Sequence, residues 1–251
     1  MTVPKFKNKH LEKALFNPGD YMDYKELPKN KIKKYIITYQ TSALNYIKRK
    51  YKPKKTELYK LLTIYQYNDI GFVKMTGIGS PNAAGVFEEL IALGGKVFLN
   101  IGTAGGLHNE GVFLCNKALR DEGTSYHYLP NGDFSYPDRN LTKKLGRSME
   151  RRGLEFFEGT TWTIDAPYRE TIKEIEEYSK KGISTVEMEA SALFAVAKYR
   201  NVRIASAFVV SDLLGKKWLP NFHRFDVKSA QNKLIDAAVD CLTNLKRDKN
   251  K

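Results

Sequence analysis

The chain is poor in cysteine, because its 251 residues include only Cys115 and Cys241. These two stand far apart and match neither a metal-ligand nor a redox spacing, which is typical of a reducing compartment, so we expect a cytoplasmic location. The apolar run at residues 204–210 is far too short to span a bilayer. Residues 1–10 lack the hydrophobic region of a secretion signal. The sequence therefore predicts neither secretion nor membrane insertion.

The chain also lacks internal repeats, low-complexity tracts and any Pro/Gly/Ser-rich linker. Its 42% hydrophobic residues suffice for one substantial core. We therefore expect a single domain over residues 1–251, in which residues 1–30 are irregular and residues 17–20 (NPGD) form a turn.

Positive charge is in excess, with a formal net charge of +14. Such a surface can attract nucleic acid or phosphorylated substrates. Lysines are spread along the chain, with clusters at residues 31–34, 48–55 and 246–251, and tyrosines interleave with the middle cluster in a way that single-stranded nucleic acid can use. No nucleic-acid-binding motif accompanies them, so we interpret the clusters as a solvated surface and expect no nucleic-acid partner.

Apolar periodicity predicts strands that alternate with helices. The predicted helices cover residues 30–50, 83–95, 141–152, 169–181, 185–197 and 227–245. The predicted strands cover residues 61–67, 71–76, 97–101, 112–118, 159–168 and 204–210. This alternation predicts an α/β fold around a mainly parallel sheet that is covered on both faces.

One predicted helix, residues 185–197 (TVEMEASALFAVA), is apolar on every side except for two carboxylates near its start. Such a helix belongs in a core, and a carboxylate that enters a core needs partners. We expect Glu187 and Glu189 at the helix N-terminus, where the macrodipole favours negative charge. A plain capping turn is the alternative, because side chains two residues apart on a helix point in different directions and cannot act as a paired acid and base.

Two glycine-rich segments each follow an apolar strand. Residues 76–81 (TGIGSP) stand before a helical pattern, with Ser80 placed as N-cap and Pro81 at the first helical position. Residues 100–106 (NIGTAGG) form a second predicted turn at the end of the strand 97–101. Two such turns at the carboxyl ends of adjacent strands form a ligand crevice. A purely structural role for the first turn stays open, and it lacks the Lys-Ser/Thr ending of a Walker loop.

Four motifs resemble those of the nucleoside phosphorylase family, which includes purine nucleoside phosphorylases, uridine phosphorylases and related nucleosidases. They are residues 76–81 (TGIGSP), 100–106 (NIGTAGG), 186–193 (VEMEASAL) and 209–212 (VVSD), in the family's order and spacing. Residues 120–128 (RDEGTSYHY) and 165–171 (DAPYRET) resemble a uridine-phosphorylase-like branch. The resemblance implies a single-domain three-layer α/β sandwich around a twisted, mostly parallel mixed sheet, assembled as homodimers or homohexamers.

The resemblance also implies a nucleoside site. Met188 would pack against the ribose, Glu189 would accept hydrogen bonds from its hydroxyls, and Glu187 would support the site. The residues that would face the ribose and the nucleophile are Thr103, Gly102, Ala104 and Gly79.

A protonated Asp212 would donate a hydrogen bond to N7 of a purine base. This hydrogen bond would stabilise the negative charge that the leaving base takes up. Asp212 favours a purine, whereas the branch resemblance favours uridine, and a helix-capping aspartate is the structural alternative. His127 and Arg169 are further candidates for contacts with base or sugar.

Other residues stand at the positions where the resemblance implies the arginines with which phosphorylases hold phosphate. Asn100 stands where one is expected, and residues 17–20, with Gly19, resemble a phosphate-binding turn followed by Asp23 instead of arginine. A third arginine would fall near Glu57. A phosphate, if used, would lie by Gly19, Asn100 and Thr103.

Asn100 is instead similar to the hydrolytic members, in which a carboxylate such as Asp23 or Glu26 would activate water. Lys25, Arg120 or a lysine of a partner subunit could rebuild a phosphate site. We therefore expect a nucleoside phosphorylase that uses phosphate as co-substrate and no other cofactor. The alternatives are a nucleosidase and, from another class, a non-catalytic protein that binds nucleosides or nucleic acid.

Overall fold

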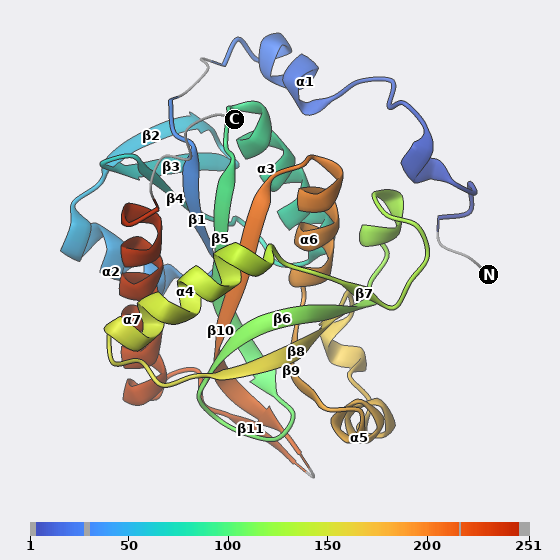
Figure 1. Cartoon of the computed structure of the whole chain (residues 1–251), viewed down its shortest axis with the longest axis vertical. Coiled ribbons are helices and arrows are strands. Elements are labelled where there is room, and N and C mark those ends of the chain that lie inside the picture. The colour runs from blue at the N-terminus through green and yellow to red at the C-terminus, as the bar shows by residue number, and fades with distance from the viewer. Residues whose placement is uncertain (1–3, 28–30, 216, 246–251) are drawn as a thin grey trace.

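A mixed sheet with helices on both faces forms the structure, a computed structural model that describes residues 4–27, 31–215 and 217–245 (Figure 1). The helices are α1 (Pro18–Tyr24), α2 (Thr41–Tyr51), α3 (Ser80–Ala92), α4 (Arg139–Arg151), α5 (Ile172–Lys180), α6 (Ala190–Tyr199) and α7 (Phe225–Thr243), with 3-10 turns η1 (Lys9–Leu11), η2 (Ser125–His127) and η3 (Pro167–Arg169). The strands are β1 (Lys34–Thr38), β2 (Lys54–Tyr59), β3 (Leu62–Tyr67), β4 (Ile70–Lys74), β5 (Val97–Gly106), β6 (Val112–Asp121), β7 (Phe134–Ser135), β8 (Phe157–Ile164), β9 (Ile183–Glu187), β10 (Arg203–Leu214) and β11 (Trp218–Pro220).

The strand order explains where a site can form. β1 pairs in parallel with both β4 and β5, and β5 pairs in parallel with β10. β6, β8 and β9 complete a ring of pairings, because β10 pairs with β6 and β9 pairs with β5. β9 runs antiparallel to β5, so its carboxyl end meets the last residues of β5. The ring therefore brings the end of β9 toward the strands β1, β5 and β10.

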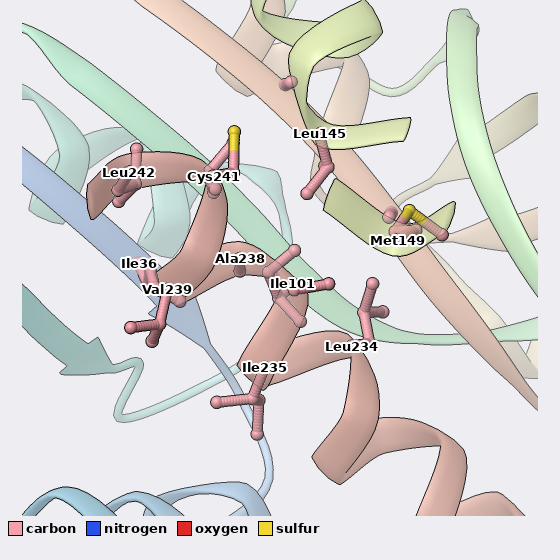
Figure 2. Close-up of a cluster of buried hydrophobic side chains, with 14 of the residues drawn as sticks. Ile36, Ile101, Leu145, Met149, Leu234, Ile235, Ala238, Val239, Cys241 and Leu242 are labelled. Carbon is pink, nitrogen blue, oxygen red and sulfur yellow. The ribbon is translucent and has the colours of Figure 1, made fainter. Parts of the chain in front are cut away.

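Helices cover both faces of the sheet, which confirms the predicted α/β class and its layers. On β1, Ile36 belongs to one hydrophobic core together with residues of α2, α4 and α7, whereas its neighbours Tyr35 and Ile37 belong to another together with residues of α3 and α6. Figure 2 shows the first of these cores, in which side chains of α7 and α4 meet strand residues. This alternation is what a strand buried on both faces requires.

The predicted helix at residues 30–50 is wrong in its first half. Tyr35, Ile36 and Ile37 belong to the strand β1, and the helix α2 begins only at Thr41. Aromatic and β-branched residues pack well on a pleated surface, and this strand pairs with β4 and β5 at its edges while helices cover both of its faces. As a result, residues 39 and 40 follow a strand end and lie beside β5.

The predicted turn at residues 17–20 is the start of a helix. Asn17 caps α1 in a capping box with Asp20, so the turn residues serve as helix start signals. α1 packs against α3, so residues 1–30 are not irregular throughout. Residues 1–3, 28–30 and the lysine cluster at 246–251 lie outside the described residues.

Two predictions around the glycine-rich and acidic motifs are also corrected. Residues 100–106 do not turn, because β5 continues through Gly106. Residues 185–187 belong to β9, where Val186 pairs with Gly105, and the helix α6 begins at Ala190. A Cβ atom on Gly105 would collide with Leu214, so glycine permits the close packing of three strands here.

Candidate active site

Two buried carboxylates lie where β9 ends and α6 begins. Glu187 Oε2 accepts the backbone N–H groups of Glu189 at 2.8 Å and Ala190 at 2.7 Å, and its Oε1 accepts the hydroxyl of Thr163 at 2.5 Å. Glu189 Oε1 accepts the backbone N–H of Gly79 at 2.6 Å. The partners that the sequence required for these carboxylates are therefore present, and they are donors that favour the charged forms.

Burial still outweighs these hydrogen bonds. It raises the pKa of both Glu187 and Glu189 above the ordinary carboxyl range, and the charge of Glu189 raises that of Glu187 further. The pair consequently retains protons at pH values where surface carboxylates have lost them. Buried carboxyl pairs with perturbed pKa values are typical of chemistry or ligand binding.

The turn between β4 and α3 joins the carboxylates. Gly79 has φ 98°, a conformation that favours glycine, and it points its N–H at Glu189. Ser80 does not cap the helix as predicted. It is the first helical residue, and its hydroxyl donates to the carbonyl of Met188 at 2.8 Å. The structure thus brings Gly79, Met188 and Glu189 together.

The end of β1 supplies two polar side chains that the sequence interpretation missed. Tyr39 Oη donates to Asn100 Oδ1 at 2.9 Å, and Gln40 Nε2 donates to Thr103 Oγ1 at 2.8 Å. The ring of Tyr39 lies over Gly102, where a Cβ atom would approach it to 3.3 Å. The available signal was a polar Tyr-Gln pair directly after an apolar β-branched run, which the helical interpretation concealed.

Neutral side chains also make up the remaining partners around Asn100 and Thr103, and we call this set of side chains the neutral wall. Asn100 Nδ2 donates to Ser206 Oγ at 3.2 Å, and Gln231 Nε2 donates to Gln40 Oε1 at 2.9 Å. Among the described residues, the side-chain partners of Asn100 and Thr103 are therefore hydroxyls and amides. Ala104 lies next along β5 with its side chain buried against the α3 and α6 side of the sheet.

Asp212 lies in β10 and does not cap a helix. Its Oδ2 accepts the indole N–H of Trp218 and its Oδ1 accepts the hydroxyl of Ser211, both at 2.8 Å. Glu170, which follows η3, is half-buried, and burial followed by the negative charge of Asp212 raises its pKa to about 7. Glu170 was not predicted as a site residue, because nothing in the sequence placed it beside Asp212.

Several candidates have contacts outside this cluster. The side chains of Asp23 on α1 and of Lys25 and Glu26 directly after it are exposed, and the N–H of Gly19 donates back to Asn17. α1 packs on α3. The side-chain partners of Asn100 and Thr103 described above are Tyr39, Gln40 and Ser206, and they include none of these residues.

The basic candidates also have local partners. The Arg120 guanidinium is buried, donates to Ser125 and to two backbone carbonyls of the loop that follows η2, and stacks on Tyr126. Nδ1 of His127 lies 2.8 Å from the Lys9 ammonium. Arg169 is exposed on η3.

Three further findings concern the described residues as a whole. Glu57 forms an exposed ion pair with Lys55 on β2. No group of three or more His, Cys, Asp or Glu side chains in the described part of the chain could hold a metal ion. None of the helices described is both long and apolar enough to cross a membrane.

Comparison with known proteins places this geometry in context. A family model described as the phosphorylase superfamily matches residues 38–243. Purine nucleoside phosphorylase of Plasmodium falciparum is 30% identical over 142 residues, which are 53% of this chain and 58% of that protein. Uridine phosphorylase of Treponema pallidum is 31% identical over 153 residues, 55% of this chain and 59% of that protein. The chain thus spans less than two thirds of the length of these curated relatives.

Solved structures extend the likeness over more of the fold. AMP nucleosidase from Bacteroides thetaiotaomicron superimposes with a TM-score of 0.75 at 20% identity, covering 92% of this chain and 100% of that one. At this identity the likeness concerns the fold alone.

Proposed function

Because the chain belongs to the phosphorylase superfamily, we propose that it cleaves the N-glycosidic bond of a nucleoside and that water is the nucleophile. Glu189 accepts hydrogen bonds from the ribose hydroxyls, Met188 packs against the sugar, and Glu187 fixes the turn that presents both. As the bond breaks, positive charge develops on the ribose, and nearby carboxylates stabilise it.

The charge of the wall around Asn100 is the observation that supports water over phosphate. Tyr39, Gln40 and the other partners there are neutral, and the negative charges of Glu189 and Glu187, after burial, raise the pKa of Tyr39 well above its ordinary value. A phosphate dianion entering this corner would meet only neutral partners among these side chains, and leaving such a charge unpaired in a buried site is costly. A neutral water pays no such penalty.

Asp212 supports a purine substrate. Both purine bases present N7 as an acceptor, so an acidic side chain beside the leaving base can deliver the proton that N7 takes up. Glu170 holds a proton up to about pH 7 on the same side of the site, which gives a second source for that proton.

Phosphorolysis is the second candidate, and one local feature favours it. α2 begins directly after Gln40, whose amide reaches Thr103, so the unpaired N–H groups of a helix N-terminus lie close to this residue. The curated relatives are phosphorylases, which points the same way.

The two candidates differ in their co-substrate and product. We would incubate the protein with adenosine, inosine, guanosine, uridine and AMP in phosphate-free buffer and in added phosphate, and identify the sugar released. Equal rates with free ribose, or ribose 5-phosphate from AMP, are expected. Base release that requires phosphate and yields ribose 1-phosphate would overturn hydrolysis. Turnover must fall at least about tenfold in Glu189→Gln, which controls for contaminating enzymes.

A further inference from the structure

Tyr39 has a fixed hydrogen-bond direction. Its hydroxyl donates to Asn100 Oδ1, and Asn100 in turn uses an amide N–H to donate to Ser206. A carbonyl oxygen can only accept, so the phenol proton is committed to Asn100. The phenol oxygen keeps lone pairs that can accept a hydrogen bond from another molecule.

The phenol also stays neutral. Burial, then the charges of Glu189 and Glu187, raise the pKa of Tyr39 well above its ordinary value, so the phenol is neutral near pH 7. Tyr39 therefore cannot serve as a general base, but it is a constant acceptor for an O–H donor.

Position adds a second constraint. Asn100 pairs with Ser206 at one level of β5 and β10, whereas Gly105, further along β5, pairs with Asp212. Val186 pairs with Gly105, and Glu187 follows it directly, so Glu187 lies near the part of β5 that precedes Gly105. Tyr39 lies over Gly102, nearer to Asn100. If the leaving base lies toward Asp212, Tyr39 lies on the opposite face of the ribose. A nucleophile that displaces the base attacks the sugar from that opposite face.

From this polarity and position we infer that Tyr39 is a positioning residue for the attacking water, whose O–H it accepts while its own proton remains on Asn100. The ring is half-buried, and Gly102 leaves the space in which it lies. This inference rests on the proposed hydrolysis. It adds that the neutral wall selects a nucleophile that can donate a hydrogen bond and carries no charge.

The inference is tested with Tyr39→Phe, which keeps the ring and removes the oxygen. We expect kcat for base release in phosphate-free buffer to fall about 10- to 100-fold while KM for the nucleoside changes less than about twofold. In buffer containing methanol, the ratio of methyl riboside to ribose should rise, because water loses the contact that orients it. A purely structural role would not shift this ratio.

Tyr46→Phe is the matched control. Its hydroxyl donates to Asp236 on the outer side of α2 and α7, so the same chemical change there should leave kcat and the product ratio as in the wild type. If Tyr39→Phe does not fold, Asn100→Ser tests the same polarity, because it removes the acceptor that holds the phenol proton, and the expected loss of kcat and rise of the ratio are the same.

The outcomes separate the two proposals. A wild-type protein that releases base only with phosphate overturns hydrolysis, and the water role of Tyr39 with it. Hydrolysis by the wild type, together with unchanged kcat and product ratio in Tyr39→Phe, overturns the role of Tyr39 alone. A rise in KM with unchanged kcat would also overturn it, since that pattern describes binding of the substrate.

Discussion

Glu189 is the residue whose loss should cost most activity. In Glu189→Gln the side chain keeps its size and one oxygen for the Gly79 N–H, but it loses the charged acceptor for the ribose hydroxyls. A hydrogen bond to a charged group contributes about 1.5–3 kcal/mol, so kcat/KM should fall about 10- to 150-fold. Initial rates of base release measure this. The exposed Glu155→Gln serves as control, and full turnover in Glu189→Gln would contradict the ribose assignment.

Glu187 allows a prediction about stability. Its pKa is raised in the folded state, so the folded protein binds this proton more tightly than the unfolded chain. Its contribution to the free energy of unfolding is therefore most favourable below the ordinary carboxyl pKa, and it declines as pH rises toward the raised value, by about 1.4 kcal/mol per unit of pKa difference.

Glu187→Gln removes this titration. The variant should gain stability relative to the wild type as pH increases from about 5 to 8, which is the window above the ordinary carboxyl pKa of about 4.3. Urea denaturation at several pH values measures the difference. A constant difference across that window would show that Glu187 does not titrate with a raised pKa.

Sequence motifs identified part of the site at this scale. Glu187, Met188, Glu189 and Gly79 were found because their motifs are short and contiguous, and the structure brings them together. Tyr39 was missed because its role depends on the pairing of β1 with β5, which involves residues some sixty positions apart.

Among the elements, β5 offers a direct test of close strand packing. A Cβ atom on Gly105 would collide with Leu214 and lie 3.0 Å from Val186 Cγ1. Gly105→Ala should therefore reduce the free energy of unfolding by about 1–3 kcal/mol. Gly85→Ala is the control: Gly85 lies in α3 with open space around its Cβ position, so alanine there should stabilise by about 0.5–1 kcal/mol. Equal destabilisation by both substitutions would contradict this packing.

Local sequence patterns predicted helices and strands well where the packing against neighbouring elements favours the same structure. α4, α7 and the β3–β4 pair match their predictions within a few residues, because their apolar periodicities are long or are bounded by a turn. β1 and the end of β9 were assigned to helices, since a short apolar run does not distinguish a buried strand from a buried helix. Only the partner strands decide between them.

At the scale of the whole molecule, the alternation of strands and helices was enough to predict the α/β class, and the structure confirms it. The ring of pairings among β5, β6, β8, β9 and β10 could not be predicted, because it depends on contacts between distant segments. That ring is what brings the carboxylates of one segment against the glycine turn of another.

The surface charge leads to the last prediction. The basic residues at 48–55 end α2 and begin β2, and Arg49 and Lys54 are exposed there. Lysines on an exposed edge strand oppose pairing of that strand with other chains. This role explains the basic residues without a nucleic-acid partner. We expect weak binding of single-stranded DNA that is lost between about 50 and 200 mM salt, because it arises from counterion release.

Fluorescence anisotropy with labelled oligonucleotides of several sequences measures this binding. Arg49→Gln combined with Lys54→Gln should weaken it equally for all sequences and reduce the salt dependence, while nucleoside cleavage is unchanged, since both residues lie on the outer side of α2 and β2. Tight binding of one sequence at about 200 mM salt would contradict a solvated surface and favour a dedicated nucleic-acid site.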